Sequence, residues 1–275
     1  MPAHQAPLLR LPLELRQHIY SYLLPHENVS HPLQAVGITS VDHCPPSSRL
    51  LNIHPLLTEE ILDYFYSIST WKLVFSHAFN FFRVDPDLRK LEQCPSLLNI
   101  KKVEVVFFCD VLLLHSYPSF GLESFCAEIK SRASRACEVL SQAPCLRTVV
   151  VSWVDSTNTG RWDEKADVIA PLRGLSDRKP DLKFQIGRIN ADDVNEEQFS
   201  AALQKVLGAG RKLDTSSEDT EHSASDLRMV AFDVRQERLK AAPGGYPDHR
   251  IRRSGWRGAP SALPATREIG VEDLG

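Results

Sequence analysis

The sequence predicts an α/β fold with a short parallel-strand array, because helical and extended segments alternate along its middle part. Three times a helical stretch ends, the chain turns at a proline, and a run rich in β-branched or aromatic residues follows. These three runs are Lys102–Phe108, Arg147–Trp153 and Lys183–Arg188. Strands that alternate with helices pair in parallel through right-handed crossovers. We therefore expect residues 47–207 to form an α/β repeat-like domain.

Apolar residues at helical spacing predict the helices of this domain. In residues 122–142 they recur on one side of the segment. Further helices are expected over 164–175 and 195–207. Ile129 lies in the first of these helices and Val150 in one of the strands, so we expect both side chains in the core.

A helix and a strand precede the array. The helix is expected over 49–67 and should break before Pro55, because the residue before a proline is disfavoured in the α region. Residues Trp71–Phe75 alternate as a strand does. Residues 26–46, which are polar and contain several histidines and prolines, are interpreted as a connection.

The composition changes after Leu207. Eight of the thirteen glycines lie beyond this residue, but only one of the twelve phenylalanines does. Such a segment cannot bury enough apolar surface to offset the entropy lost on ordering. We expect residues 208–275 to be a mostly disordered tail, with one candidate helix over 225–241.

The overall composition is that of a globular protein without a strong charge bias. Hydrophobic residues make up 43% of the chain, which is enough for a buried core. The formal net charge of −3 argues against a nucleic-acid-binding protein, which usually has a strongly basic face. We find neither an apolar leader nor a stretch long enough to span a membrane. The six cysteines, without Cys-x-x-Cys spacing, are expected to be reduced thiols, which predicts a cytoplasmic or nuclear protein.

Catalytic and cofactor-binding motifs are missing from the sequence. It contains no Gly-x-Ser-x-Gly, no phosphate-binding Gly-x-x-x-x-Gly-Lys loop and no His-Glu-x-x-His. The acidic pair Asp192-Asp193 is interpreted as a surface feature that adds charge to a helix or caps its end, and not as a pair of catalytic acids. His43 next to Cys44 suggests zinc, but a closed zinc site needs four ligands, usually in paired short spacings. We therefore expect no enzyme, no metal and no cofactor.

The N-terminal stretch Leu8–Pro25 predicts an amphipathic helix. Pro12 lies where the helix begins, a position that suits proline because its missing N–H would be unpaired there anyway. Leu15, Ile19 and Leu23 then recur every four residues, which places them on one face of the helix.

This stretch resembles the F-box-like opening of many fungal proteins, which begin Leu-Pro-x-Glu-Leu/Ile-Arg-x-x-Ile-Tyr. The matching residues are Leu11, Pro12, Glu14, Leu15, Arg16, Ile19, Tyr20 and Leu23. The resemblance defines residues 8–46 as an F-box-like segment. In F-box proteins the Leu-Pro pair and the apolar stripe after it bind the Skp adaptor of a cullin–RING ubiquitin ligase. The partner-binding residues that the resemblance implies here are Leu11, Pro12, Leu15, Ile19 and Leu23.

The resemblance extends further in part. Residues 50–67 are similar to the second signature of the fungal group, a helix that ends in Phe-Tyr-Ser before a strand ending in Phe. The Val-Cys-x-x-Trp segment of a full F-box is absent. The α/β array resembles the irregular leucine-rich-like repeats that follow the F-box in some substrate receptors.

The function that the resemblance implies is that of an adaptor or substrate receptor of a cullin–RING (SCF-type) ubiquitin ligase. Its expected partners are a Skp-type adaptor and a protein substrate. The alternative is a non-enzymatic scaffold or interaction protein that uses the F-box-like helix only as part of its core.

Overall fold

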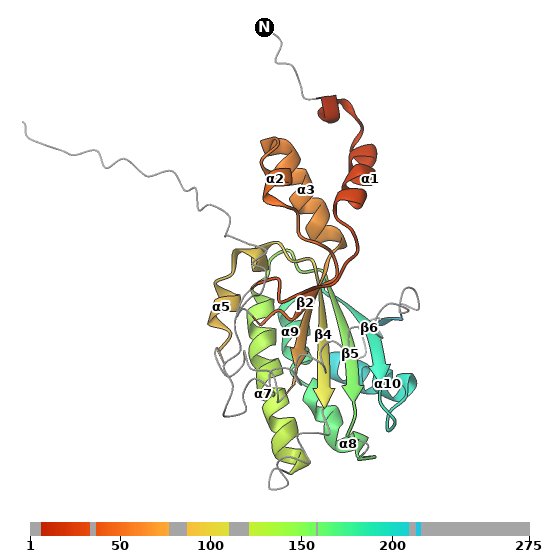
Figure 1. The fold of residues 1–275 in the computed structure, drawn as a ribbon. Coiled ribbons are helices and arrows are strands. Elements are labelled where there is room, and N and C mark those ends of the chain that lie inside the picture. Colours follow the sequence, from red (N-terminus) through yellow and green to blue (C-terminus); the bar gives the residue numbers. More distant parts are fainter. Residues whose placement is uncertain are drawn as a thin grey trace, which may run out of the picture. The chain divides into compact units, whose positions relative to one another are not determined.

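The described part of the chain forms one mixed α/β unit (Figure 1). The computed structural model describes residues 7–33, 37–76, 87–109, 121–157, 159–208 and 213–215. Their strands make a seven-stranded sheet in which the strand order follows the chain order. The predicted α/β class is confirmed.

Five neighbouring strands of the sheet are parallel, and two short strands at one edge are antiparallel. The strands are β1 (Val29–Ser30), β2 (Ser40–Val41), β3 (Thr70–Phe75), β4 (Lys102–Cys109), β5 (Thr148–Asp155), β6 (Lys183–Asn190) and β7 (Leu213–Thr215). The interpretation of residues 26–46 as a plain connection is wrong, since β1 and β2 lie within it. These strands are only two residues long and carry no alternating apolar pattern, so no local signal predicts them.

The helices agree with the predicted segments, with one exception. They are α1 (Leu13–Leu23), α2 (Ser48–Leu51), α3 (Pro55–Ile68), α5 (Arg89–Glu92), α7 (Leu122–Ser141), α8 (Trp162–Lys165), α9 (Leu172–Arg178) and α10 (Glu196–Leu207), with 3-10 turns η1 (Pro7–Arg10), η2 (Pro95–Leu98) and η3 (Ala166–Ile169). The break before Pro55 is confirmed, and the side chain of His54 caps α3 by accepting a hydrogen bond from the N–H of Leu56. The single helix expected over 164–175 is wrong. The chain forms α8, η3 and α9 instead, because Pro171 cannot donate the backbone hydrogen bond that a continuous helix needs.

The helices of the parallel part pack on a single face of the sheet. Each crossover leads to the next strand in the same direction, and right-handed crossovers of this kind place every helix on the same side. In accord with this, α7 contacts η3 and α9, and α9 contacts α10 (Figure 1). On the sheet side, the ring of Trp153 contacts those of Trp162 in α8 and Phe199 in α10.

The strand register separates the core face of the sheet from its opposite face. Side chains one row apart along the strands point to opposite faces. The row that faces the helices is fully buried and consists of Trp71, Val103, Val149 and Phe184. The next row, on the opposite face, is only half-buried and consists of Lys72, Glu104, Val150 and Gln185. Ile129 in α7 is fully buried as expected, but the expectation that Val150 lies in the core is wrong.

The C-terminal part of the chain is described only in β7, which pairs with β6. Three residues of the segment expected to be tail therefore belong to the sheet. The remainder of that segment beyond Gly208, including the candidate helix over 225–241, lies outside the described residues. Within the described ranges, every helix is too short or too polar to cross a membrane.

Candidate protein-interaction site

One glutamate of α3 binds two side chains of α1. The guanidinium of Arg16 donates from Nε and Nη2 to the two carboxylate oxygens of Glu60, at 2.8 and 2.9 Å. The hydroxyl of Tyr20, one turn further along α1, donates to the same carboxylate at 3.1 Å. Such paired, charge-assisted hydrogen bonds fix orientation as well as position. The glutamate thus sets which face of α1 turns toward α3.

The contacts also show that α1 and α3 run in the same direction. Arg16 contacts Glu60, and Tyr20 packs against Tyr64 with ring centroids 6.0 Å apart, so both pairs are separated by 44 residues. Burial, together with the hydrogen bond and the charge of Glu60, raises the pKa of Tyr20 to about 12. The N-terminal ends of the two helices therefore lie on the same side of this pair.

The stripe predicted on α1 faces away from the core. Tyr20 is the one fully buried residue of the helix. It lies about 100° around the helix axis from Ile19, so the stripe lies beside the buried face and not on it. Leu15 and Leu23 keep 52% and 49% of their surface exposed, and Ile19 between them is half-buried. Of the two other predicted contact residues, Leu11 is half-buried and Pro12 is exposed. All five predicted residues are thus accessible on the folded chain.

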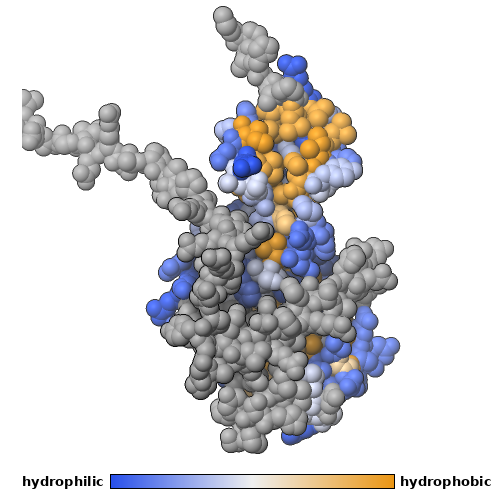
Figure 2. Space-filling view, in the orientation of Figure 1, coloured by the Kyte–Doolittle hydropathy of each residue, from blue (hydrophilic) through white to orange (hydrophobic). Residues whose placement is uncertain are grey.

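Further exposed apolar residues lie on the N-terminal helices. We call the whole set the apolar surface, and it comprises Leu13, Leu15, Tyr22 and Leu23 of α1 together with Ile53, just before α3, and Leu56 in its first turn. Figure 2 shows hydrophobic residues gathered over these N-terminal helices. A concentration of this kind is unusual on a monomer and is typical of an interaction site. The sequence reasoning missed Ile53 and Leu56, because only the pairing of α1 with α3 brings them to the same end of the helix pair.

A buried ionic cluster lies at the carboxyl ends of the parallel strands. The ammonium group of Lys165, at the end of α8, contacts the carboxylates of Asp155 at the end of β5 and Asp193 after β6. It also donates to the hydroxyl of Thr157 at 3.1 Å. The side chain of Lys165 is fully buried, and those of the two aspartates are 1% and 7% exposed. The interpretation of Asp193 as a helix cap is wrong, since Asn195 caps α10 and Asp193 pairs with Lys165.

Comparison with known proteins leaves the family of this chain open: no family model, no curated protein and no solved structure matches it. The fold and the apolar surface define it as an α/β protein with an N-terminal helix pair that exposes hydrophobic side chains. Its function has to be inferred from these features.

Glu60→Ala is expected to lower the free energy of unfolding by about 1.5–3 kcal/mol, because it removes the carboxylate that the half-buried Arg16 guanidinium and the Tyr20 hydroxyl share, and leaves Arg16 only its bonds to backbone carbonyl oxygens. Urea denaturation measures the change. Glu59→Ala is the matched control, since Glu59 is exposed and precedes Glu60 in the same helix. That variant should stay within about 0.5 kcal/mol of wild type. Equal effects of the two substitutions would contradict the attachment of α1 through Glu60.

Proposed function

We propose that this protein is an F-box-like adaptor or substrate receptor that mediates protein–protein interaction, with a Skp-type adaptor of a cullin–RING ubiquitin ligase as its partner. The observation that carries the proposal is the orientation of α1. Its stripe of Leu15, Ile19 and Leu23, which matches the family's partner-binding positions, is accessible while Tyr20 is buried.

The orientation of α1 favours an interface over a purely structural role. A helix that served only as core would turn its leucines inward, because burying one leucine is worth about 1.5–3 kcal/mol. Here the helix is held by Arg16 and Tyr20 instead, and its leucines remain half-exposed. A partner that covered them would recover the apolar burial that the folded chain forgoes. The scaffold alternative, in which the helix is only core, has less support for this reason.

The two parts of the chain have different roles in this proposal. The apolar surface of the N-terminal helices binds the adaptor, and the α/β domain holds the protein substrate. Substrate contacts are expected at the half-buried row of the sheet that carries Lys72 and Glu104, because the helices cover the other face and the neighbouring row with Val74 and Val106 is buried. The chemistry of catalysis would come from the ligase partner.

Leu15→Glu is expected to weaken binding of the full-length chain to a Skp-type adaptor by tenfold or more, because a charge would have to be desolvated at the interface. Co-purification of the co-expressed proteins, followed by titration of the purified chain, measures this effect. The melting temperature should stay close to that of wild type, since Leu15 is already 52% exposed.

Leu98→Glu is the matched control for this experiment. Leu98 is a leucine of similar exposure, 56%, but it lies in η2 and not in the N-terminal helices. Adaptor binding should survive this substitution. Failure of the wild-type chain to retain the adaptor would overturn the ligase proposal and favour the scaffold. Equal loss in both variants would show that binding does not use the apolar surface.

A further inference from the structure

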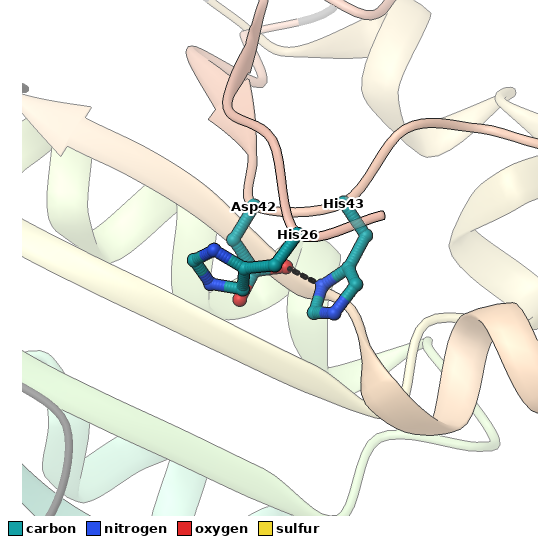
Figure 3. Close-up of side chains that lie close together, drawn as sticks. All are labelled: His26, Asp42 and His43. Carbon is teal, nitrogen blue, oxygen red and sulfur yellow. Dashed lines mark hydrogen bonds and ion pairs between the residues drawn. The ribbon is translucent and has the colours of Figure 1, made fainter. Parts of the chain in front are cut away.

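Two histidines and an aspartate converge where the chain leaves α1 and returns from β2. His26 follows the end of α1, and Asp42 and His43 follow β2 directly (Figure 3). One potential ligand atom from each of the three side chains lies within 4.8 Å of the other two. Among the residues that the structure describes, this is the one group of three or more histidine, cysteine or acidic side chains with such spacing.

The three side chains are held in place by contacts that need no metal. The Nδ1 atom of His43 and the Oδ1 atom of Asp42 are 2.8 Å apart, and the backbone N–H of Thr70 donates to the same oxygen at 2.7 Å. The rings of His26 and His43 meet edge to face, with centroids 4.9 Å apart. The N–H of Cys44 donates to the carbonyl oxygen of Pro25 at 3.1 Å, which ties the two segments together.

We propose that His26, Asp42 and His43 form a binding site for a divalent transition-metal ion of the zinc type. Two imidazoles and one carboxylate are a donor set that zinc accepts, at ligand distances of about 2.0–2.2 Å. Three protein ligands leave one position of a tetrahedral ion for water.

Only a small movement would complete the site. Ligand atoms around a tetrahedral zinc ion lie about 3.3–3.5 Å apart, given bond lengths near 2.1 Å. The present separations of up to 4.8 Å would therefore have to shorten by at most about 1.5 Å. His26 is exposed, so its side chain can make this movement without disturbing the core, whereas Asp42 and His43 are half-buried and better fixed.

The neighbouring thiol already has a partner. The Sγ atom of Cys44 donates to the carboxylate of Glu27 at 3.4 Å, and Cys44 is not part of the group of converging side chains. We therefore leave Cys44 out of the donor set. Because both segments connect the N-terminal helices to the sheet, a bound metal would stabilise the base of the helix pair. This inference is independent of the proposed function.

Zinc itself is the probe for this site. We expect the melting temperature of the full-length, chelator-treated chain to rise with added Zn²⁺, since a ligand that binds only the folded state stabilises it. His26→Ala should weaken the zinc affinity at least tenfold, because even the outer-shell partners of metal ligands contribute 10- to 100-fold. Its melting temperature without zinc should match wild type, since His26 is exposed.

Three further variants make the test specific. His18→Ala removes an exposed histidine of α1 outside the cluster and should retain the zinc effect. Asp42→Asn, which keeps an oxygen to accept from Thr70, should reduce the zinc affinity. Cys44→Ser should leave it unchanged. The inference is overturned by a wild-type chain that does not respond to zinc, by a response that survives in His26→Ala, or by a response that depends on Cys44.

Discussion

Val149→Lys is expected to abolish the cooperative unfolding transition of this protein, whereas Val150→Lys leaves the transition near that of wild type. Val149 is fully buried between the sheet and the helix layer. An ammonium group there would be unpaired, and burying an unpaired charge costs several kcal/mol in addition to the lost apolar contacts. The total is comparable to the whole stability of a domain, about 5–15 kcal/mol.

The neighbouring position serves as the control because the same lysine meets a different environment there. Val150 lies on the half-buried face, directly beside Glu104 in the register of β4 and β5. The new ammonium group would remain close to water and to a carboxylate, so the change should stay within about 1 kcal/mol. Thermal unfolding followed by circular dichroism measures both variants. The opposite order of stability would mean that the register of β5 is shifted by one residue.

Lys165→Met is expected to lower the free energy of unfolding by about 3–5 kcal/mol, because it leaves the buried carboxylates of Asp155 and Asp193 without their counter-ion. Methionine keeps most of the side-chain volume, so the loss of stability comes from removing the charge and not from creating a cavity. Adding Asp193→Asn to this variant removes one of the two unpaired charges and should restore part of the stability. Urea denaturation at neutral pH measures all three proteins.

Lys130→Met is the matched control for the buried cluster. Lys130 also pairs with an aspartate, Asp167, but the two side chains are 40% and 68% exposed. Exposed pairs of this kind contribute about 0–1 kcal/mol. A loss as large as that of Lys165→Met, or a Lys165→Met variant as stable as wild type, would contradict the assignment of a buried ionic cluster.

The pH dependence of stability offers a second measure of Lys165. Burial by itself lowers the pKa of this group, but its hydrogen bonds to Asp155 and Asp193 outweigh that effect and raise the pKa above its ordinary 10.5. A folded-state pKa above the unfolded value contributes stability that is complete below pH 10.5 and is lost as the pH rises through the folded value. Wild type should therefore lose stability more steeply than Lys165→Met at strongly alkaline pH.

Much of the secondary structure could be predicted from local patterns. The proline turns before extended runs predicted β4, β5 and β6 to within a few residues. The helical spacing of apolar residues predicted α7 and α10. Such patterns work because they depend on residues a few positions apart. The short strands β1 and β2 escaped because they arise from pairing with β3 and not from a pattern of their own.

The candidate sites depended more strongly on contacts between distant residues. The sequence by itself determined that Leu15, Ile19 and Leu23 share one face of α1, because helical geometry dictates it. Which way that face turns was decided by Glu60, which lies 44 residues away and binds Arg16. Periodicity states only that a helix has two faces, and the tertiary contact selects the buried one.

The same limit explains the other differences between sequence and structure. The run Val149-Val150-Val151 reads as uniformly apolar, and the sequence determined that it is a strand. Only the position of the helices on one face of the sheet decided that Val150 lies on the opposite face. Likewise, the sequence supplied Asp42 and His43 as neighbours, but the fold brought His26 to them. A side chain's burial and its partners are set by elements far apart in the chain, and a local pattern carries no information about those elements.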